Sequence, residues 1–270
     1  MARIGLVPGR ISRSSRLAAT LVADAISKAT GLAGDAFVAR EPRELVERFA
    51  AGYIDIVWAS PTLFLQSPQL EVAAPIAVSV RNGSPHYHSV FFVRRDSAFR
   101  SPLDLRGKSV AWVASTSASG YILPRMALAD MGVHADELFK KQVFVGTHGN
   151  VAHMVREGEV ACGAGYAHFI DGDLTQGVRA ASYSESGDGA DMRVLLASPP
   201  IPSDLFLAHP SAAEKCDLFE AIEEARLASP EPFEQLFGID GFARPDAGAL
   251  AQLRRSLDAA RSFGVLGLPS

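Results

Sequence analysis

Apolar runs alternate with helical periodicities along the first part of the chain. The run from Ile4 to Val7, closed by Pro8 and Gly9, predicts a buried strand that leads into a loop. From Ser14 to Ala29 apolar residues recur at helical spacing, with Ser14 or Ser15 as the cap. The pattern continues with a strand at Phe37–Ala39, a helix at Pro42–Ala51 and a strand at Ile54–Ala59. Such alternation predicts a mostly parallel sheet with helices on both faces.

The pattern changes in the middle of the chain. Two β-rich runs, Val72–Val80 and Ser89–Arg95, flank a turn-forming stretch and predict a long pair of crossing strands. After them the α/β alternation starts afresh, which predicts a second lobe. Its expected elements are a strand at Ser109–Val113, a helix at Ala118–Met131, a strand at Gln142–Val145, a helix at Asn150–Glu157 and a strand at Val160–Gly165.

The last part of the chain indicates a return to the first lobe. A loop at Ser184–Asp191 precedes a strand at Arg193–Ala197, and three prolines then enforce an extended passage. A strand at Leu205–Ala208 and two helices, Ala212–Leu227 and Ala247–Phe263, follow. We therefore expect an α/β protein in which residues 1–84 and 203–270 form lobe 1, residues 85–202 form lobe 2, and hinge crossings lie near 82–90 and 197–205.

Composition and charge limit the classes of protein to which this chain can belong. With 26 basic and 30 acidic residues, dispersed along 270 positions, the net charge is −4, which argues against a nucleic-acid partner. No window approaches the roughly 18 to 20 apolar residues that span a bilayer. The N-terminus lacks the features of a secretory signal, so the chain is either a trimmed exported protein or cytoplasmic. Cys162 and Cys216 are expected to be inert core thiols, with a single disulfide as the alternative.

The most informative segment runs from Val113 to Tyr121, where a buried strand meets a hydroxyl-rich turn and then a helix. Free backbone N–H groups and the positive end of the helix dipole converge there, and Ser117 and Ser119 add hydroxyl donors. This combination suits an oxyanion. Ordinary N-capping is the alternative interpretation of the same residues.

Other strand ends offer weaker candidates. Val145–Asn150 lies at the same expected sheet edge, and His148 there either donates to an anion or caps its helix. Ser60 follows a strand of lobe 1 and starts a helix. Tyr87 and Asp204 lie near the two crossings, where the alternatives are packing for Tyr87 and capping for Asp204.

Motifs for catalysis are absent from the sequence. It has no Gly-x-Ser-x-Gly elbow, no His-Glu-x-x-His, no phosphate-loop lysine motif and no dinucleotide fingerprint. His86 and His88 alternate on one expected strand face and have the spacing of a metal pair, but no third ligand stands nearby. We therefore expect neither a metal nor a cofactor.

Several segments together resemble a known family, the phosphate, phosphite and phosphonate solute-binding proteins of ABC transporters. Leu105–Lys108 is similar to the family's Leu-Lys-Gly-Lys, and Ser117–Tyr121 to its Ser-Thr-Ser-Gly-Tyr turn. The other matching segments are Tyr87–Val90, Gly146–His148, Glu157–Ala164 and Ser198–Asp204. The resemblance implies the two-lobed type II periplasmic-binding-protein fold and a ligand in the cleft between the lobes.

The resemblance also implies which residues bind the ligand. Ser117, Ser119 and the backbone between them would hold phosphoryl oxygens, assisted by Tyr87 and His148, and Asp204 would contact the ligand's substituent. The full candidate set is Ser60, Tyr87, Ser117, Ala118, Ser119, Tyr121, Thr147, His148, Tyr166 and Asp204. Ala118 replaces the family's threonine, and no acid stands near His168, where aminophosphonate binders have a glutamate.

The leading hypothesis is a monomeric binding protein that closes like a hinge on a small phosphorus oxyanion and delivers it to a permease. It would be periplasmic or extracellular if a signal peptide was removed, and otherwise cytoplasmic. One alternative is a cytoplasmic enzyme of the menaquinone-pathway type on the same fold, with His148, Tyr166 or Asp204 as its acid or base. Another is a ligand-sensing module.

Overall fold

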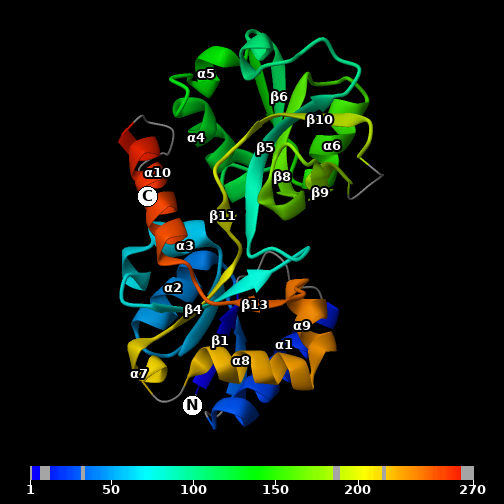
Figure 1. The fold of residues 1–270 in the computed structure, drawn as a ribbon. Coiled ribbons are helices and arrows are strands. Elements are labelled where there is room, and N and C mark those ends of the chain that lie inside the picture. The colour runs from blue at the N-terminus through cyan, green and yellow to red at the C-terminus, as the bar shows by residue number, and fades with distance from the viewer. Residues whose placement is uncertain (1, 7–12, 32–33, 185–188, 215–216, 263–270) are drawn as a thin grey trace. The chain divides into compact units, whose positions relative to one another are not determined.

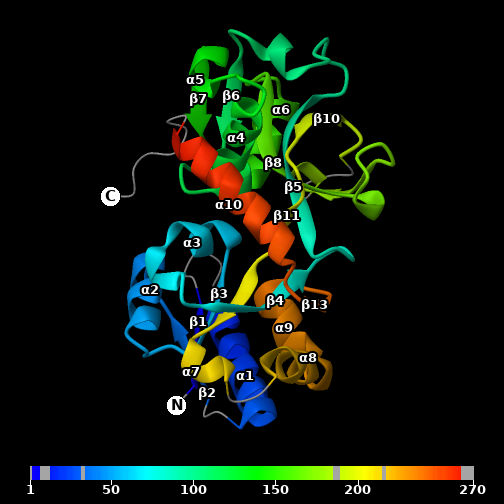
Figure 2. The same ribbon diagram turned by 60° about the vertical axis from the view of Figure 1, so that its left-hand side comes forward.

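The computed structural model describes residues 2–6, 13–31, 34–184, 189–214 and 217–262. Contacts divide the chain into two compact units (Figures 1 and 2). Unit 1 comprises residues up to Pro85 and the segment Pro202–Ala247, and unit 2 comprises His86–Ile201 and the chain from Gly248 onward.

Unit 1 is built on a six-stranded sheet in the order β13-β4-β12-β3-β1-β2. The strands are β1 (Ala2–Leu6), β2 (Gly34–Val38), β3 (Ile56–Ala59), β4 (Ala74–Val80), β12 (Leu205–Ala208) and β13 (Gly241–Ala243). Strands β2, β1 and β3 are parallel, whereas β12 runs antiparallel to both β3 and β4. The helices are α1 (Arg13–Thr30), α2 (Pro42–Ala50), α3 (Pro61–Gln66), α7 (Pro210–Ala213), α8 (Leu218–Ala228) and α9 (Pro230–Phe237), with the 3₁₀ turn η2 (Pro68–Leu70).

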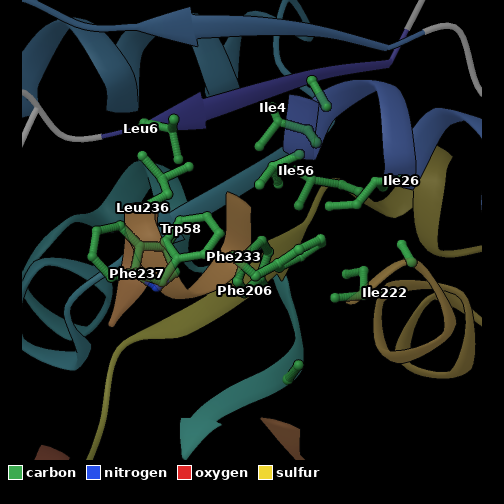
Figure 3. Packing of buried hydrophobic residues seen from close by; sticks show 14 of the residues in the cluster. Ile4, Leu6, Ile26, Ile56, Trp58, Phe206, Ile222, Phe233, Leu236 and Phe237 are labelled. Atoms are coloured by element: carbon green, nitrogen blue, oxygen red, sulfur yellow. The ribbon is translucent and has the colours of Figure 1, made fainter. Parts of the chain in front are cut away.

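An apolar core fills one face of this sheet. Phe233 and Phe237 of α9 pack beside Trp58 and Phe206 of the sheet, and the rings of Trp58 and Phe237 are 4.9 Å apart (Figure 3). Helices α1 and α8 complete the same cluster. The opposite face is covered by α2. The Leu45 side chain of this helix lies so close to Gly5 that a Cβ on Gly5 would be 2.4 Å from the Leu45 side chain.

Unit 2 has a central sheet in the order β10-β5-β8-β6-β7, with β11 paired to β5 and β9 to β8. The strands are β5 (His86–Arg94), β6 (Ser109–Trp112), β7 (Lys141–Phe144), β8 (Cys162–Phe169), β9 (Val178–Ala181), β10 (Met192–Ala197) and β11 (Ile201–Pro202). Strands β7, β6 and β8 are parallel, and β5 runs antiparallel to β8.

Helices cover both faces of this second sheet. The helices assigned to unit 2 are α4 (Leu123–Ala129), α5 (Ala135–Leu138), α6 (His148–Arg156) and α10 (Ala247–Ser262), together with a π-helical turn η4 (Ala118–Ile122) and the 3₁₀ turns η3 (Pro102–Leu105), η5 (Ile170–Gly172) and η6 (Ser182–Ser184). One apolar cluster lies between the sheet and α6, and the other between the sheet and α4 with α5.

The structure differs from the sequence-based elements in several places. The expected helix at Ala212–Leu227 is two helices, α7 and α8, and the expected helix at Ala118–Met131 begins with the π-helical turn. Helix α9 and strands β9, β11 and β13 were not expected from the pattern. The short strands carry too few residues for a periodic signal, and Ser229, Pro230 and Pro232 in the α9 region obscure its period.

The C-terminal helix α10 is assigned to one lobe by the sequence pattern and to the other unit by the contacts. The sequence-based boundaries assign all of 203–270 to lobe 1, whereas contacts group the chain from Gly248 onward with unit 2. Leu253 of α10 lines a small apolar hollow together with Leu123 and Met126 of α4 and with Ile201. Burial of its apolar face against these residues explains why α10 belongs with unit 2.

Candidate functional site

The turn after β6 has the geometry of a capped helix start. Ser117 is the N-cap residue, with φ −72° and ψ 121°, and its hydroxyl accepts a hydrogen bond from the Gly120 N–H at 3.1 Å. The chain then winds through η4, where the Ile122 N–H donates to the Ser117 carbonyl at 3.0 Å. The N–H groups of Ala118 and Ser119 have no acceptor within the helix, because they belong to its first turn.

Two residues explain why the turn adopts this shape. Gly120 packs against Val113, the residue after β6, so tightly that a Cβ would lie 2.4 Å from the Val113 side chain and 2.9 Å from the Ser117 hydroxyl. Pro124 lies one turn further on and has no N–H to donate. Glycine thus permits the close approach to the strand, and proline removes a backbone bond that would tighten the helix.

The loop after β7 lies directly beside this turn. The N–H groups of Val145 and Gly146 donate to the carbonyls of Trp112 and Val113 at 3.0 Å and 2.8 Å. Thr147 caps α6 by accepting from the Asn150 N–H at 3.1 Å. The helix begins at His148 instead of the expected Asn150, so His148 occupies its first turn, near the positive end of the helix dipole.

Strands β5 and β8 connect the two helix starts through side chains. Ser89 of β5 is buried, pairs with Tyr166 in the antiparallel register, and donates its hydroxyl to the Ser119 carbonyl at 2.9 Å. The Tyr166 ring packs edge to face with the His148 ring at 5.2 Å. The structure therefore brings Ser119, Tyr166 and His148 into one contact network, with Ser89 as its connecting residue.

Tyr87 belongs to the same part of unit 2. It lies in β5 two residues before Ser89 and is half-buried. Side chains two residues apart on a strand point to the same face of the sheet. Tyr87 thus shares the face from which Ser89 reaches the turn.

Tyr121 has a different environment from the other candidates. Its ring packs at 5.4 Å against Trp112 and at 5.2 Å against Phe144, and the Arg125 guanidinium lies 5.1 Å from the ring centre. The Tyr121 ring is held by these packing contacts. Tyr121 is therefore a weaker candidate for a ligand contact than Ser117 or His148.

Arg125, which contacts the Tyr121 ring, belongs to a polar network. Arg125 is buried and pairs with both carboxylate oxygens of Asp136 at 3.0 and 2.7 Å. Gln142 donates to Asp136 at 2.7 Å and accepts from the Trp112 indole at 2.9 Å. The hydrogen bonds from Arg125 and then Gln142 lower the pKa of Asp136 to about 2. The charge of Arg125 is therefore balanced within this network.

The two candidates of unit 1 have defined partners there. Ser60 follows β3 and caps α3 by accepting from the Leu63 N–H at 3.2 Å, and its hydroxyl lies 3.0 Å from that of Thr62. Asp204 is paired with Arg81 at 2.9 Å, and Arg81 also donates to the Phe237 carbonyl at 2.9 Å. The resemblance assigns Asp204 a ligand contact, and this carboxylate already has a cation beside it.

Two of the remaining chemical candidates, His88 and Cys162, lie in the interior of unit 2. His88 is buried with Nδ1 2.8 Å from the Ser198 carbonyl, and among the described residues no group of three or more histidine, cysteine or acidic side chains gathers in a metal-like cluster. Cys162 is a buried free thiol whose pKa is raised by burial, and Cys216 lies outside the described residues.

Sequence reasoning did not single out Ser89, Ser198 or Arg125. Ser89 stands within the segment Tyr87–Val90, but its hydroxyl contact depends on a turn thirty positions later in the chain. A serine directly before the apolar run Val90–Val93 is the one signal that points to a buried hydrogen bond there.

The two α/β units, each with helices on both faces of its sheet, have the type II periplasmic-binding-protein fold, which solved binding proteins share. A family model described as "ABC transporter, phosphonate, periplasmic substrate-binding protein" matches residues 4–249. The chain belongs to this family. Within the described part of the chain, no helix combines the length and hydropathy needed to cross a membrane.

Solved structures agree with this fold. The protein XAC2383 from Xanthomonas citri, bound to ATP, is similar with 20% identity and a TM-score of 0.75 over 97% of this chain and 98% of that one. A binding-protein component of an ABC phosphonate transporter from Pseudomonas aeruginosa has 17% identity and a TM-score of 0.64 over 100% and 90% of the two chains. PhnD1 from Prochlorococcus marinus, in complex with methylphosphonate, has 16% identity and a TM-score of 0.63 over 98% of each chain.

Proposed function

We propose that this protein captures a small phosphorus oxyanion, namely phosphate, phosphite or a phosphonate, and delivers it to the permease of an ABC transporter. The ligand oxygens are bound by the Ser117 and Ser119 hydroxyls and by the N–H groups of Ala118 and Ser119. Thr147, His148, Tyr87 and Tyr166 complete the set in unit 2. Ser60 and Asp204 are the proposed contributors from unit 1.

The observation that carries this proposal is the contact network at one edge of the unit 2 sheet. The parallel strands β6 and β7 end side by side, and each is followed by a capped helix start. Ser89 contacts the Ser119 carbonyl, while the Tyr166 ring contacts His148. Hydroxyl and N–H donors at the starts of helices are suited to an oxyanion.

The donors proposed in unit 2 suit a small ligand that is recognised by its geometry. The hydrogen-bonding groups assigned to the ligand in unit 2 are hydroxyls, backbone N–H groups and one imidazole, while the nearby Arg125 is already paired with Asp136. A site built from such donors selects by geometry, since a wrong ligand leaves buried donors unpaired. Family membership supports transport as the use of this binding and the periplasm as the proposed location. A monomer is the proposed state, because hinge closure requires both lobes to be free to move.

The proposal is tested by calorimetry on protein that has been unfolded and refolded to remove carried-over ligand. Phosphate, phosphite, methylphosphonate, aminoethylphosphonate and sulfate are titrated into wild type, Ser117→Ala and Ser101→Ala. Ser101 is the matched control, because its hydroxyl caps η3 by accepting from the Leu103 N–H at 3.0 Å, as Ser117 caps the turn.

We expect micromolar or tighter binding of at least one phosphorus oxyanion, weakened about tenfold or more by Ser117→Ala and unchanged by Ser101→Ala. Binding of sulfate alone would show that the ligand is a sulfur oxyanion and would contradict a phosphorus ligand. Absence of binding for all five compounds would contradict the proposed function.

A further inference from the structure

The Ser119–Gly120 peptide of the turn is held at both ends by serine hydroxyls. Its N–H donates to the Ser117 hydroxyl at 3.1 Å, and its carbonyl accepts from the Ser89 hydroxyl at 2.9 Å. Ser89 also lies 3.4 Å from the Gly165 carbonyl, but one hydroxyl has one proton and the shorter contact takes it. The orientation of this peptide therefore depends on Ser89 as well as on Ser117.

The helix itself cannot supply the partner that Ser89 provides. In a π-helical turn the Ser119 carbonyl would accept from the residue five positions on, which is Pro124 and has no N–H. The N–H one position earlier, on Leu123, is used by the Ala118 carbonyl. Ser89 thus replaces a missing backbone donor, and Ser89 is only 1% exposed, so water does not take its place.

Ser89 is at the same time tied to the second chain segment that connects the units. Its N–H donates to the Ser198 hydroxyl at 2.9 Å, and the Ser198 N–H donates to the Ser89 carbonyl at 2.8 Å. The neighbouring His88 ring reaches the Ser198 carbonyl at 2.8 Å. Ser89 and Ser198 each lie within four residues of a position where the chain passes from one unit to the other.

We propose that Ser89 is a positioning residue of the oxyanion site, whose hydroxyl fixes the Ser119–Gly120 peptide against the paired connecting segments 86–90 and 197–201. It does not touch the ligand. Through the Ser119–Gly120 peptide it fixes Ser117, whose hydroxyl accepts from the Gly120 N–H, and the adjoining N–H group of Ser119. This inference rests on the proposed function.

The test compares Ser89→Ala, Ser89→Thr and Ser109→Ala by calorimetry with the oxyanion that binds wild type best, together with thermal unfolding of each unliganded variant. Ser109 is the matched control, because its hydroxyl accepts from the Ala161 N–H at 3.1 Å at the opposite end of β6. Ser89→Thr retains the hydroxyl and shows whether the effect depends on that group.

We expect the Kd to rise about tenfold in Ser89→Ala, to stay within about threefold of wild type in Ser89→Thr, and to be unchanged in Ser109→Ala even where its thermal midpoint falls. A double variant with Ser117→Ala should weaken binding by less than the product of the single effects, because both serines hold one peptide.

Equal Kd values for wild type and Ser89→Ala, with Ser117→Ala still impaired, would overturn the positioning role and leave the proposed function intact. The positioning role also fails if Ser89→Thr binds as weakly as Ser89→Ala, or if Ser109→Ala weakens binding to the same degree. If wild type binds none of the oxyanions, the proposed function fails, and the role of Ser89 fails with it.

Discussion

Gly120 determines how closely the oxyanion turn approaches its strand. The space that a Cβ would need is occupied by Val113 and by the Ser117 hydroxyl, so every larger residue must displace one of them. Val113 is part of the unit 2 core and yields little, because well-packed interiors resist added volume. The turn is therefore the part that moves.

We expect Gly120→Ala to lower the free energy of unfolding by about 1–3 kcal/mol and to weaken oxyanion binding, since the Ser117 hydroxyl loses its position. Urea unfolding and calorimetry measure the two effects. Gly149→Ala is the control for stability, because the nearest atom to its Cβ would be the Thr147 hydroxyl at 4.0 Å. Unchanged stability and unchanged binding in Gly120→Ala would contradict this account of the turn.

At the scale of elements, a polar network links α4, α5 and β7 through Arg125, Asp136 and Gln142. Arg125 is almost fully buried, whereas the Asp136 side chain is 68% exposed. Loss of the carboxylate leaves a buried guanidinium with weaker compensation, although water near Asp136 limits the cost. The network thus anchors the helix whose first turn carries the proposed donors.

We expect Asp136→Asn to lower the free energy of unfolding by about 1 kcal/mol at neutral pH. Because the pKa of Asp136 is about 2 in the folded protein and about 3.9 when unfolded, its contribution is present above pH of about 4 and is lost as the pH falls toward 2. The gap between variant and wild type should therefore close in that range.

Urea unfolding at a series of pH values measures this gap. Glu47→Gln is the control, because Glu47 forms a solvent-exposed pair with Arg43 at 2.7 Å and should cost less than about 0.5 kcal/mol. A gap for Asp136→Asn that stays constant down to pH of about 2 would show that the carboxylate charge is not what stabilises the network.

Elements with a clear period were predictable from the sequence, and contacts between distant segments were not. Strand Leu205–Ala208 matches its prediction, and helix α1 differs from its prediction by one residue at each end, since its apolar positions recur over many turns. The π-helical start of the helix after Ser117 was not predictable, because it depends on close packing of Gly120 against Val113. The Ser89 bond to Ser119 likewise requires the sheet order.

At the scale of the whole molecule, the chain passes between its units at three places, after Pro85, after Ile201 and after Ala247. The sequence-based hypothesis placed hinge crossings near 82–90, from a change in the α/β alternation, and near 197–205, from three prolines. It placed none near Ala247, because α10 has an ordinary amphipathic pattern, and such a pattern shows that one face is buried but not against which unit.

The central claim is that this fold binds a phosphorus oxyanion, and phosphorus NMR of methylphosphonate tests it most directly. Refolded wild-type protein is added in equimolar amount at neutral pH, and Ser117→Ala is measured in parallel. We expect the free resonance of methylphosphonate, or of phosphate or phosphite measured in the same way, to be replaced or markedly shifted by a protein-bound one with wild type, and to be largely retained with Ser117→Ala. A free resonance that wild-type protein leaves unchanged, with phosphate and phosphite also unaffected, would contradict the account.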